Sequence, residues 1–381
     1  MEFLNLTEEQ KALLDSTNRY IERRVKPMRK EIDNRPVPKA MAHEVMGELA
    51  ELGFIGGTLP VEMGGGGLSY LTEGLLYEQL AKAFAGLAGI AFITSSTAKA
   101  VALEGSDQHR AAYLKGLLKG ELIGCVAITE PDVGSNPSDV KTTATRDGDD
   151  WIISGEKSWI SNGDISDICI VVARRSGGEG LSRFITERAD GYTTRDIEKM
   201  AMNEWPTSII HFDQIAVPDW RRLGGEGTGL KATLKGFEVA RAYVALLALG
   251  IAEAALEGAI EYAKVRRQWG KPIGQHQLVQ QMLADMAIMT DAARLLTLRG
   301  LALIDQGVRC DTQTSMAKAY TTEAAVKVAS LGVQIHGAYG ISKEYPAERL
   351  FREARVLPIP DGTTQIQKLI IGRNLTGFRA F

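Results

Sequence analysis

One carboxylate stands between a proline and a glycine in the stretch VLPIPDGTTQIQKLIIGR, residues 356–373. It belongs to Asp361, which precedes a short apolar segment that predicts a helix, and two roles are open to it. An acidic side chain in this position can cap the first N–H groups of the helix, a role in which Asp is among the best residues. It can also be a general base that faces a molecule bound in front of the helix, where free N–H groups favour an anion. Residue statistics alone favour the cap, because caps outnumber catalytic bases.

The elements that must position this carboxylate follow from the hydrophobic pattern, which divides the chain into three parts. Residues 1–118 show helical periodicity. Residues 119–224 change to short apolar or alternating runs cut by Gly, Asn and Asp, which is typical of antiparallel strands and tight turns. Residues 225–381 return to long helical patterns of the kind that pack as a four-helix bundle. We therefore predict a mostly α-helical protein with an inserted β domain.

Composition and charge argue against several classes of function. The chain of 381 residues is 45% hydrophobic and 24% charged, as in ordinary globular proteins. Its formal net charge of -3 gives no field that would mark the whole protein for nucleic acid or anionic lipid. The amino terminus carries acids where a targeting peptide needs basic residues, and the longest uncharged run is too short to cross a bilayer. We expect a cytoplasmic protein that binds neither nucleic acid nor membrane.

The sequence lacks the usual motifs of metal and nucleotide sites. Cys125, Cys169 and Cys310 are far apart and set in apolar surroundings, which suits reduced thiols packed as small hydrophobes. The five histidines are scattered without ligand spacing, so we predict no metal site. The glycines of GGEGTGL, residues 224–230, follow no βαβ strand and indicate a turn that joins two domains. Neither a P-loop nor an esterase elbow occurs.

Three long strings, in this order, resemble the flavin-dependent acyl-CoA dehydrogenases. AITEPDVGSNPSDVKTTATRDGDDWIISGEKSWISNGDISD is similar to the middle domain of that family. RRQWGKPIGQHQLVQQMLADMA and QIHGAYGISKEYPAERLFREARVLPIPDGTTQIQKLIIGR are similar to its two carboxyl-terminal signatures. The resemblance covers essentially the whole chain. It implies an amino-terminal helical domain, a central antiparallel β-barrel and a carboxyl-terminal four-helix bundle that together bind FAD and an acyl-CoA thioester.

The resemblance assigns FAD contacts to residues of the middle domain that would otherwise be ordinary turn or strand residues. Thr129 would contact the pyrimidine edge of FAD and Ser135 its pyrophosphate region, although Ser and Thr are also common in polar turns. Trp159 and Ser161 would pack on the isoalloxazine ring and hydrogen-bond it, although aromatic and hydroxyl residues also favour strands.

A second set of residues would reach the FAD of a neighbouring subunit. Arg266, in the basic string KVRRQWG, is either a solvated helix end or a bidentate partner of the pyrophosphate, and the resemblance favours the second role. Trp269 stands where Phe is more frequent in the family, and Ala338 where a second glycine is common. The remaining members of the set are Gln277, Gln334 and Gly337. Because two subunits would build each cofactor site, we expect a homotetramer, a dimer of dimers.

Oxidising a thioester between its α and β carbons needs a base for the α proton, donors for the carbonyl oxygen and an acceptor for the β hydride. By resemblance, Asp361 is the base, its backbone N–H and a ribityl hydroxyl of FAD are the donors, and flavin N5 is the acceptor. Thr363 and Gln365 would contact FAD beside it, although taken alone they are first-turn residues of a helix. Burial is expected to raise the pKa of Asp361 toward a useful value.

The chain departs from the family at the base itself, because most members have Glu at the position of Asp361. Asp is shorter by one methylene, about 1.5 Å of reach, and an ångström of misplacement costs on the order of a hundredfold in rate. Ala240 stands where some relatives carry the base instead, so no carboxylate is available there. Phe237, Glu238 and Arg241 match CoA-contacting or structural positions, although the two charges could also be plain surface charges. Either the backbone shifts to compensate, or the α carbon of the substrate lies closer to the helix, as a ring or a branch there would require. Asp as the base resembles two subgroups, the dehydrogenases of alicyclic acyl-CoAs such as cyclohexanecarboxyl-CoA and the nitroalkane oxidases, of which we favour the first.

Three functional hypotheses remain open at this point. The leading one is an FAD-dependent acyl-CoA dehydrogenase that passes electrons to an electron-transfer flavoprotein. The second is a nitroalkane- or amine-oxidising flavoenzyme that uses Asp361 as base and oxygen as acceptor. The third is a flavin-bearing protein that associates with DNA, although such relatives carry a basic carboxyl-terminal extension and this chain stops at GFRAF.

Overall fold

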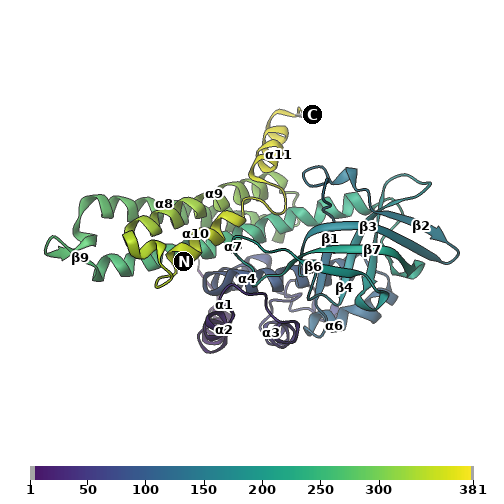
Figure 1. The fold of residues 1–381 in the computed structure, drawn as a ribbon, viewed down its shortest axis with the longest axis horizontal. Coiled ribbons are helices and arrows are strands. Elements are labelled where there is room, and N and C mark those ends of the chain that lie inside the picture. The colour runs from purple at the N-terminus through teal and green to yellow at the C-terminus, as the bar shows by residue number, and fades with distance from the viewer. Residues whose placement is uncertain (1–4, 379–381) are drawn as a thin grey trace.

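The computed structural model describes residues 5–378, so the first four residues and the last three of GFRAF lie outside it. Figure 1 shows a β sheet at one end of the protein and a long bundle of helices at the other, with the amino-terminal helices packed beneath their junction. In chain order, helices α1 to α6 precede the sheet and helices α7 to α11 follow it. The predicted order of a helical part, a β domain and a helical bundle is confirmed.

The amino-terminal part is built around one long, kinked helix. Helix α4 is two helical arms joined at Phe84, where φ of -158° and ψ of 85° interrupt the helix. Helix α4 packs against α1 of this part and against α7 and α8 of the bundle, so it links the two parts. The helices are α1 (Glu8–Tyr20), α2 (Lys26–Ile32), α3 (Lys39–Glu51), α4 (Tyr70–Glu104), α5 (Asp107–His109) and α6 (Lys115–Leu118).

The middle part is one eight-stranded sheet with the strand order β6-β7-β3-β2-β4-β5-β8, in which β1 pairs with β4. Its strands are β1 (Gly124–Ala127), β2 (Thr143–Asp147), β3 (Asp150–Ser161), β4 (Ile168–Arg175), β5 (Leu181–Glu187), β6 (Thr193–Asp196), β7 (Thr207–Pro218) and β8 (Arg222–Leu223). Most neighbours are antiparallel, as predicted, but β4 is parallel to both β1 and β2. Parallel pairing needs a long connection. The β2–β3 hairpin lies in the chain between β1 and β4, and β3 lies between β2 and β4. A purely antiparallel barrel is thereby corrected to a mixed sheet.

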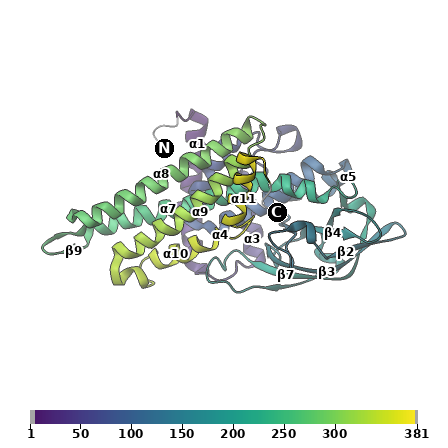
Figure 2. The same cartoon turned by 90° about the horizontal axis from the view of Figure 1, so that it is seen from above.

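The carboxyl-terminal part is a bundle in which α7, α8, α9 and α10 run alongside one another (Figure 2). Helix α11 packs on α9 at the end of the bundle that meets the sheet, and the small β9–β10 hairpin forms the opposite tip (Figure 1). The elements are α7 (Gly229–Val265), β9 (Arg267–Gln268), β10 (Lys271–Pro272), α8 (Gln277–Asp305), α9 (Asp311–His336), α10 (Ala347–Val356) and α11 (Thr364–Thr376).

Helices α4 and α7 pass through the centre of the main apolar core. By length and composition both could cross a membrane, but 72% of the apolar window of each is buried inside the protein. Packing therefore accounts for their apolarity. Gly250 of α7 allows the two helices to approach closely, because a Cβ atom there would lie 2.5 Å from the Lys82 nitrogen and 2.7 Å from the Ala81 Cβ. Gly258, on the same helix, has nothing within 4 Å of such an atom.

Gly250→Ala is expected to destabilise the protein, because the added methyl group overlaps the backbone of α4 and such overpacking costs about 1–3 kcal/mol. Gly258→Ala is the matched control, since the same change meets empty space and is expected to stabilise by roughly 0.5–1 kcal/mol. Urea denaturation midpoints of the two variants and the wild type measure both effects. A midpoint for Gly250→Ala at or above that of the wild type would contradict the close approach of the helices.

Candidate active site

Asp361 lies in the turn between α10 and α11, where the chain changes direction. Its φ of 53° is in the left-handed region, and Gly362 follows with φ of 87°. Left-handed backbone is uncommon for residues other than glycine, and Asp is one of the side chains that tolerate it. Two successive left-handed residues place the Asp361 side chain directly before the amino end of α11.

Helix α11 is capped by Thr363 and not by Asp361. The Thr363 hydroxyl accepts a hydrogen bond from the Ile366 backbone N–H at 3.4 Å. Within residues 5–378, no hydrogen bond reaches the carboxylate of Asp361, and no acceptor binds its backbone N–H. The capping role that residue statistics favoured is therefore excluded. Both the carboxylate and the amide remain available to a bound molecule.

Two buried cations lie near the Asp361 carboxylate. Loss of hydration on burial raises the pKa of Asp361, and the charges of Lys318 on α9 and Arg241 on α7 offset part of that rise. Lys318 is fully buried and donates to the Gly362 carbonyl at 2.8 Å. Arg241 is also buried, and its Nε has no hydrogen-bond partner among the described residues. The carboxylate thus has a raised proton affinity without being drawn into an ion pair.

The predicted substrate-contacting residues lie on the first half of α7. Arg241 faces Asp361, whereas the Glu238 carboxylate accepts from the Cys310 backbone N–H at 2.5 Å and so satisfies an amide at the start of α9. Glu238 is therefore a structural contact and not a plain surface charge. Phe237 and Ala240 are half-buried on the same helix. Among these residues, Arg241 is the one whose charge lowers the pKa of Asp361.

The β domain presents Trp159 in an unusual conformation. Its φ is 62° and its side chain is 59% exposed, and the register of β3 against β7 shifts between Lys157 and Ile160. A bulky residue with positive φ is an outlier, and bulges often re-aim a side chain next to an active site. The Ser158 backbone N–H donates to the Thr129 carbonyl at 2.8 Å. This bond brings Thr129 close to Trp159, so two of the residues predicted to contact FAD lie near each other.

A buried ion pair holds these two segments together. The Lys157 ammonium, which is fully buried, lies 2.8 Å from the Glu130 carboxylate and donates to the Ile128 carbonyl at 2.9 Å. Burial lowers the pKa of Lys157 to about 8. Burial would raise the pKa of Glu130, but hydrogen bonds from Lys157 and Thr142 outweigh it, and the net shift is downward. Sequence reasoning missed both members of the pair, because a lysine in a strand is normally exposed.

The chemistry of the remaining side chains suits a flavin. Ser135 lies in an exposed turn, Ser161 is half-buried at the end of β3, and Thr363 is half-buried at the start of α11. With Trp159 they offer hydroxyl groups and one exposed aromatic face, as a planar ring system with polar edges requires. Gln365 is exposed on the first turn of α11. Within the described chain, no group of three His, Cys, Asp or Glu side chains could hold a metal ion.

The second set of predicted cofactor residues lies at the other end of the bundle. Arg241 and Arg266 are about 25 residues apart along α7, which at 1.5 Å per residue is about 37 Å. Figure 1 shows β9, next to Arg266, at the tip remote from the sheet. Trp269 at this tip is 92% exposed. Also exposed near this end are Gln277, Gln334 and Gly337. Within one chain these residues do not meet Asp361.

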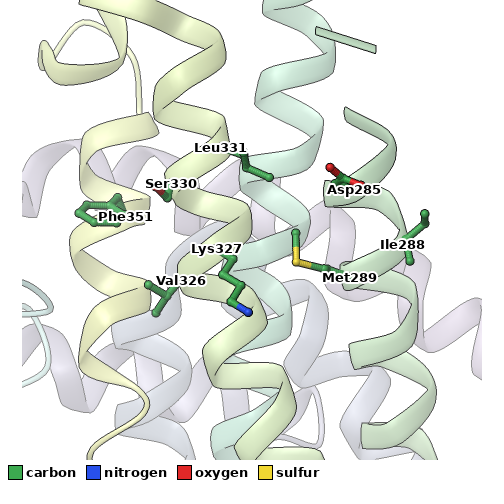
Figure 3. A pocket seen from close by; sticks show the side chains of 8 residues that line it. All are labelled: Asp285, Ile288, Met289, Val326, Lys327, Ser330, Leu331 and Phe351. Atoms are coloured by element: carbon green, nitrogen blue, oxygen red, sulfur yellow. The ribbon is translucent and has the colours of Figure 1, made fainter. Parts of the chain in front are cut away.

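A hollow separate from Asp361 opens on the outer face of the bundle, between α8, α9 and α10 (Figure 3). Its volume is about 570 Å³. Large exposed apolar side chains, Ile288 and Phe351, stand at its rim. The complete lining is Asp285, Ile288, Met289, Val326, Lys327, Ser330, Leu331 and Phe351. No predicted site residue lines this hollow, and its apolar character is typical of protein contact surfaces.

Family models match the three parts of the chain in order. The acyl-CoA dehydrogenase N-terminal domain matches residues 7–121, the middle domain residues 125–215 and the C-terminal domain residues 227–376. The chain belongs to the acyl-CoA dehydrogenase family. It is therefore an FAD-dependent oxidoreductase that acts on acyl-CoA thioesters. The alternative of nitroalkane or amine oxidation receives no support from these matches.

Individual members of the acyl-CoA dehydrogenase family align over nearly the whole chain. Cyclohex-1-ene-1-carbonyl-CoA dehydrogenase of Syntrophus aciditrophicus is 34% identical, over 97% of this chain and 90% of its own. Caffeyl-CoA reductase-Etf complex subunit CarC of Acetobacterium woodii is 33% identical, over 86% of this chain and 88% of its own. A glutaryl-CoA dehydrogenase from Mycobacterium smegmatis, solved in complex with FADH2, superposes with a TM-score of 0.92 at 29% identity, covering 99% of this chain and 96% of its own.

Trp159→Asn is expected to weaken FAD binding without destabilising the flavin-free protein. Asn tolerates left-handed backbone, so relief of strain is expected to leave the free energy of unfolding unchanged or to raise it by about 1 kcal/mol. Loss of the aromatic face removes stacking worth about 0.5–1.5 kcal/mol, which is roughly a two- to tenfold loss of FAD affinity. Thermal melts with and without FAD measure both quantities. A lower flavin-free Tm together with unchanged FAD affinity would instead make Trp159 a structural residue.

Proposed function

We propose that the protein catalyses α,β-dehydrogenation of a cyclic or branched acyl-CoA, with Asp361 as the base that removes the α proton. The observation that carries the proposal is the free carboxylate of Asp361, which caps no helix, accepts no hydrogen bond from a described residue and is partly buried in front of α11. A group in this state is suited to proton abstraction, because burial favours its neutral, protonated product.

The residues around Asp361 have complementary roles in this mechanism. The Asp361 backbone N–H has no acceptor among the described residues, so it can donate to the thioester carbonyl oxygen as negative charge develops there. Arg241 and Lys318 keep the carboxylate ionised before proton transfer, since their charges lower its pKa. Trp159, Thr129, Ser135, Ser161 and Thr363 would hold FAD, and bound FAD supplies the hydride acceptor at the β carbon.

A cyclic or branched substrate follows from the short reach of the base. Asp places its carboxylate about 1.5 Å less far from the backbone than Glu does. A ring or a branch at the α carbon would bring that carbon closer to the turn, within reach of the shorter side chain. The cyclohex-1-ene-1-carbonyl-CoA dehydrogenase among the relatives supports a cyclic acyl group. The Etf complex subunit among them supports an electron-transfer flavoprotein as the electron acceptor.

We further propose a homotetramer, a dimer of dimers, in the cytoplasm. Residues that suit FAD lie at two ends of the bundle about 37 Å apart, too far for one chain to bring them to a single cofactor. Rotating a second subunit by 180° would place its Arg266 tip at the Asp361 end of the first, as in a symmetric dimer. The apolar hollow between α8, α9 and α10 offers a further surface for subunit contact.

Asp361→Asn is expected to abolish flavin bleaching by substrate, with a loss of at least about 10³-fold in rate, because the amide cannot accept the α proton. FAD is expected to stay bound, since the change is nearly isosteric. Anaerobic spectra with straight, branched and cyclic acyl-CoA esters measure the bleaching. Asp361→Glu is the control for reach and is expected to shift preference toward straight-chain esters. Bleaching of Asp361→Asn at the wild-type rate would overturn the assignment of the base.

Co-expression of Asp361→Asn with Arg266→Ala tests whether two subunits share each site. Each variant alone is expected to be inactive or flavin-depleted. In a mixed dimer, one of the two sites contains both native residues, so about half of the wild-type activity is expected per dimer. Differently tagged chains allow the hybrid to be purified and assayed. Pairing Asp361→Asn with the double variant leaves no intact site and is the control, whereas an inactive hybrid in the main experiment would contradict the shared site.

A further inference from the structure

We propose that Lys318 is a positioning residue for the reaction: its buried ammonium binds the backbone on both sides of Asp361 and holds the turn that aims the carboxylate. The inference rests on the proposed role of Asp361 as base. Lys318 lies on α9, far from the turn in sequence, and was not among the residues that the sequence indicated as functional.

The contacts of Lys318 are to the turn that carries Asp361. Its Nζ donates to the Gly362 carbonyl at 2.8 Å and to the Pro358 carbonyl at 3.4 Å. These two carbonyls stand one residue after and three residues before Asp361. The lysine side chain is fully buried, and burying a charge costs several kcal/mol unless its environment compensates. A neutral, apolar side chain would fill the same space without that cost, so the charge is better explained by a task at the turn.

Gln367 holds the same turn from the side of α11. Its Nε2 donates to the Asp361 carbonyl at 3.1 Å and to the Gly362 carbonyl at 2.9 Å, and the side chain is fully buried. A Cβ atom on Gly362 would lie 2.7 Å from that Nε2, so glycine is needed for the contact. Lys318 and Gln367 thus bind three carbonyls of the turn and leave the Asp361 carboxylate free. Side chains, and not the carboxylate itself, hold the left-handed backbone in place.

The charge of Lys318 also acts on the carboxylate. Asp361 is faced by Lys318 from α9 and by Arg241 from α7, and both lower its pKa against the effect of burial. Lys318 is faced in turn by Asp361, Arg241 and Glu323. Burial lowers the pKa of Lys318 itself to about 8, so the ammonium is charged at pH values below that. The further charged groups around Arg241 are Asp311, Glu238 and Arg373.

These contacts predict a pH effect that a purely structural lysine would not produce. The folded-state pKa of Asp361 is raised, so the carboxylate loses its activity as a base when pH falls through that value. Removing the Lys318 charge takes away an interaction that lowers this pKa. The pKa of Asp361 then rises further, and the acid limb of the bleaching rate moves to higher pH.

The experiment measures the rate of anaerobic flavin bleaching against pH in the FAD-loaded enzyme. Lys318→Gln retains an N–H donor without the charge, and Lys318→Met removes both. Both variants are expected to shift the acid limb to higher pH. Lys318→Met is expected to lose in addition about 10- to 100-fold in rate at its optimum, because the turn is no longer held. Substrate affinity is expected to change less than threefold. Lys30→Gln, at an exposed lysine on α2, makes the same change away from the site and is the control; it is expected to match the wild type.

A wild-type acid limb in Lys318→Gln would overturn the inference, as would a loss of substrate affinity that accounts for the whole effect in either variant. Should Lys318→Met fail to fold, the pH profile of Lys318→Gln decides alone. Failure of the base assignment is distinguishable, because Asp361→Asn would then still bleach. An inactive Asp361→Asn combined with an unshifted Lys318→Gln would refute only the role of the lysine.

Discussion

The length of one helix constrains the whole functional arrangement. Helix α7 runs without interruption from the edge of the sheet to the tip of the bundle, and Gly250 lets it lie against α4 along the way. It carries Arg241 beside the catalytic turn and ends at Arg266. Because an α-helix is stiff over this distance, the separation between these two arginines is fixed by the residue count. No side-chain movement within a subunit can close it.

The turn that carries Asp361 shows how a buried carboxylate can be placed without hydrogen-bonding to its own surroundings. A carboxylate before a helix normally caps it or pairs with a cation, and either contact would lower its proton affinity. Here Thr363 caps the helix, and Lys318 and Gln367 bind carbonyl groups of the backbone. The polar contacts that stabilise the turn are thereby separate from the Asp361 carboxylate. On the role proposed above, that separation leaves the left-handed aspartate available as a base.

Local pattern predicted the large features of the fold and failed where long-range contacts decide. The helical and strand periodicities of the sequence predict the three parts correctly, because such a periodicity is set by residues that are close in sequence. The parallel pairing of β4 with β1 and β2 depends on which distant strands meet, which alternation does not encode. In DGTT, both Asp361 and Thr363 are good caps, and only the backbone geometry chooses between them.

The buried lysines were missed for a similar reason. Charged residues are usually exposed, so a lysine in a strand or a helix is normally predicted to face the solvent. Lys157 and Lys318 are instead fully buried. Their partners, Glu130 for one and the carbonyls of residues 358 and 362 for the other, are distant in sequence. The resemblance to a family supplied the roles of Asp361 and Trp159, whereas the physical support for those roles came from the backbone angles and contacts.

The exposed hairpin at the tip of the bundle has a consequence for a newly made subunit. Because Trp269 is almost fully exposed, an isolated chain has an uncovered apolar side chain at this tip. The turn of Asp361, at the other end of the bundle, is already formed in the same chain. In the two-subunit arrangement proposed above, such a chain is folded but binds FAD weakly, because it lacks the contacts from the Arg266 tip of a second subunit. In that arrangement, catalytic competence depends on the association of two subunits and not on the folding of one chain alone.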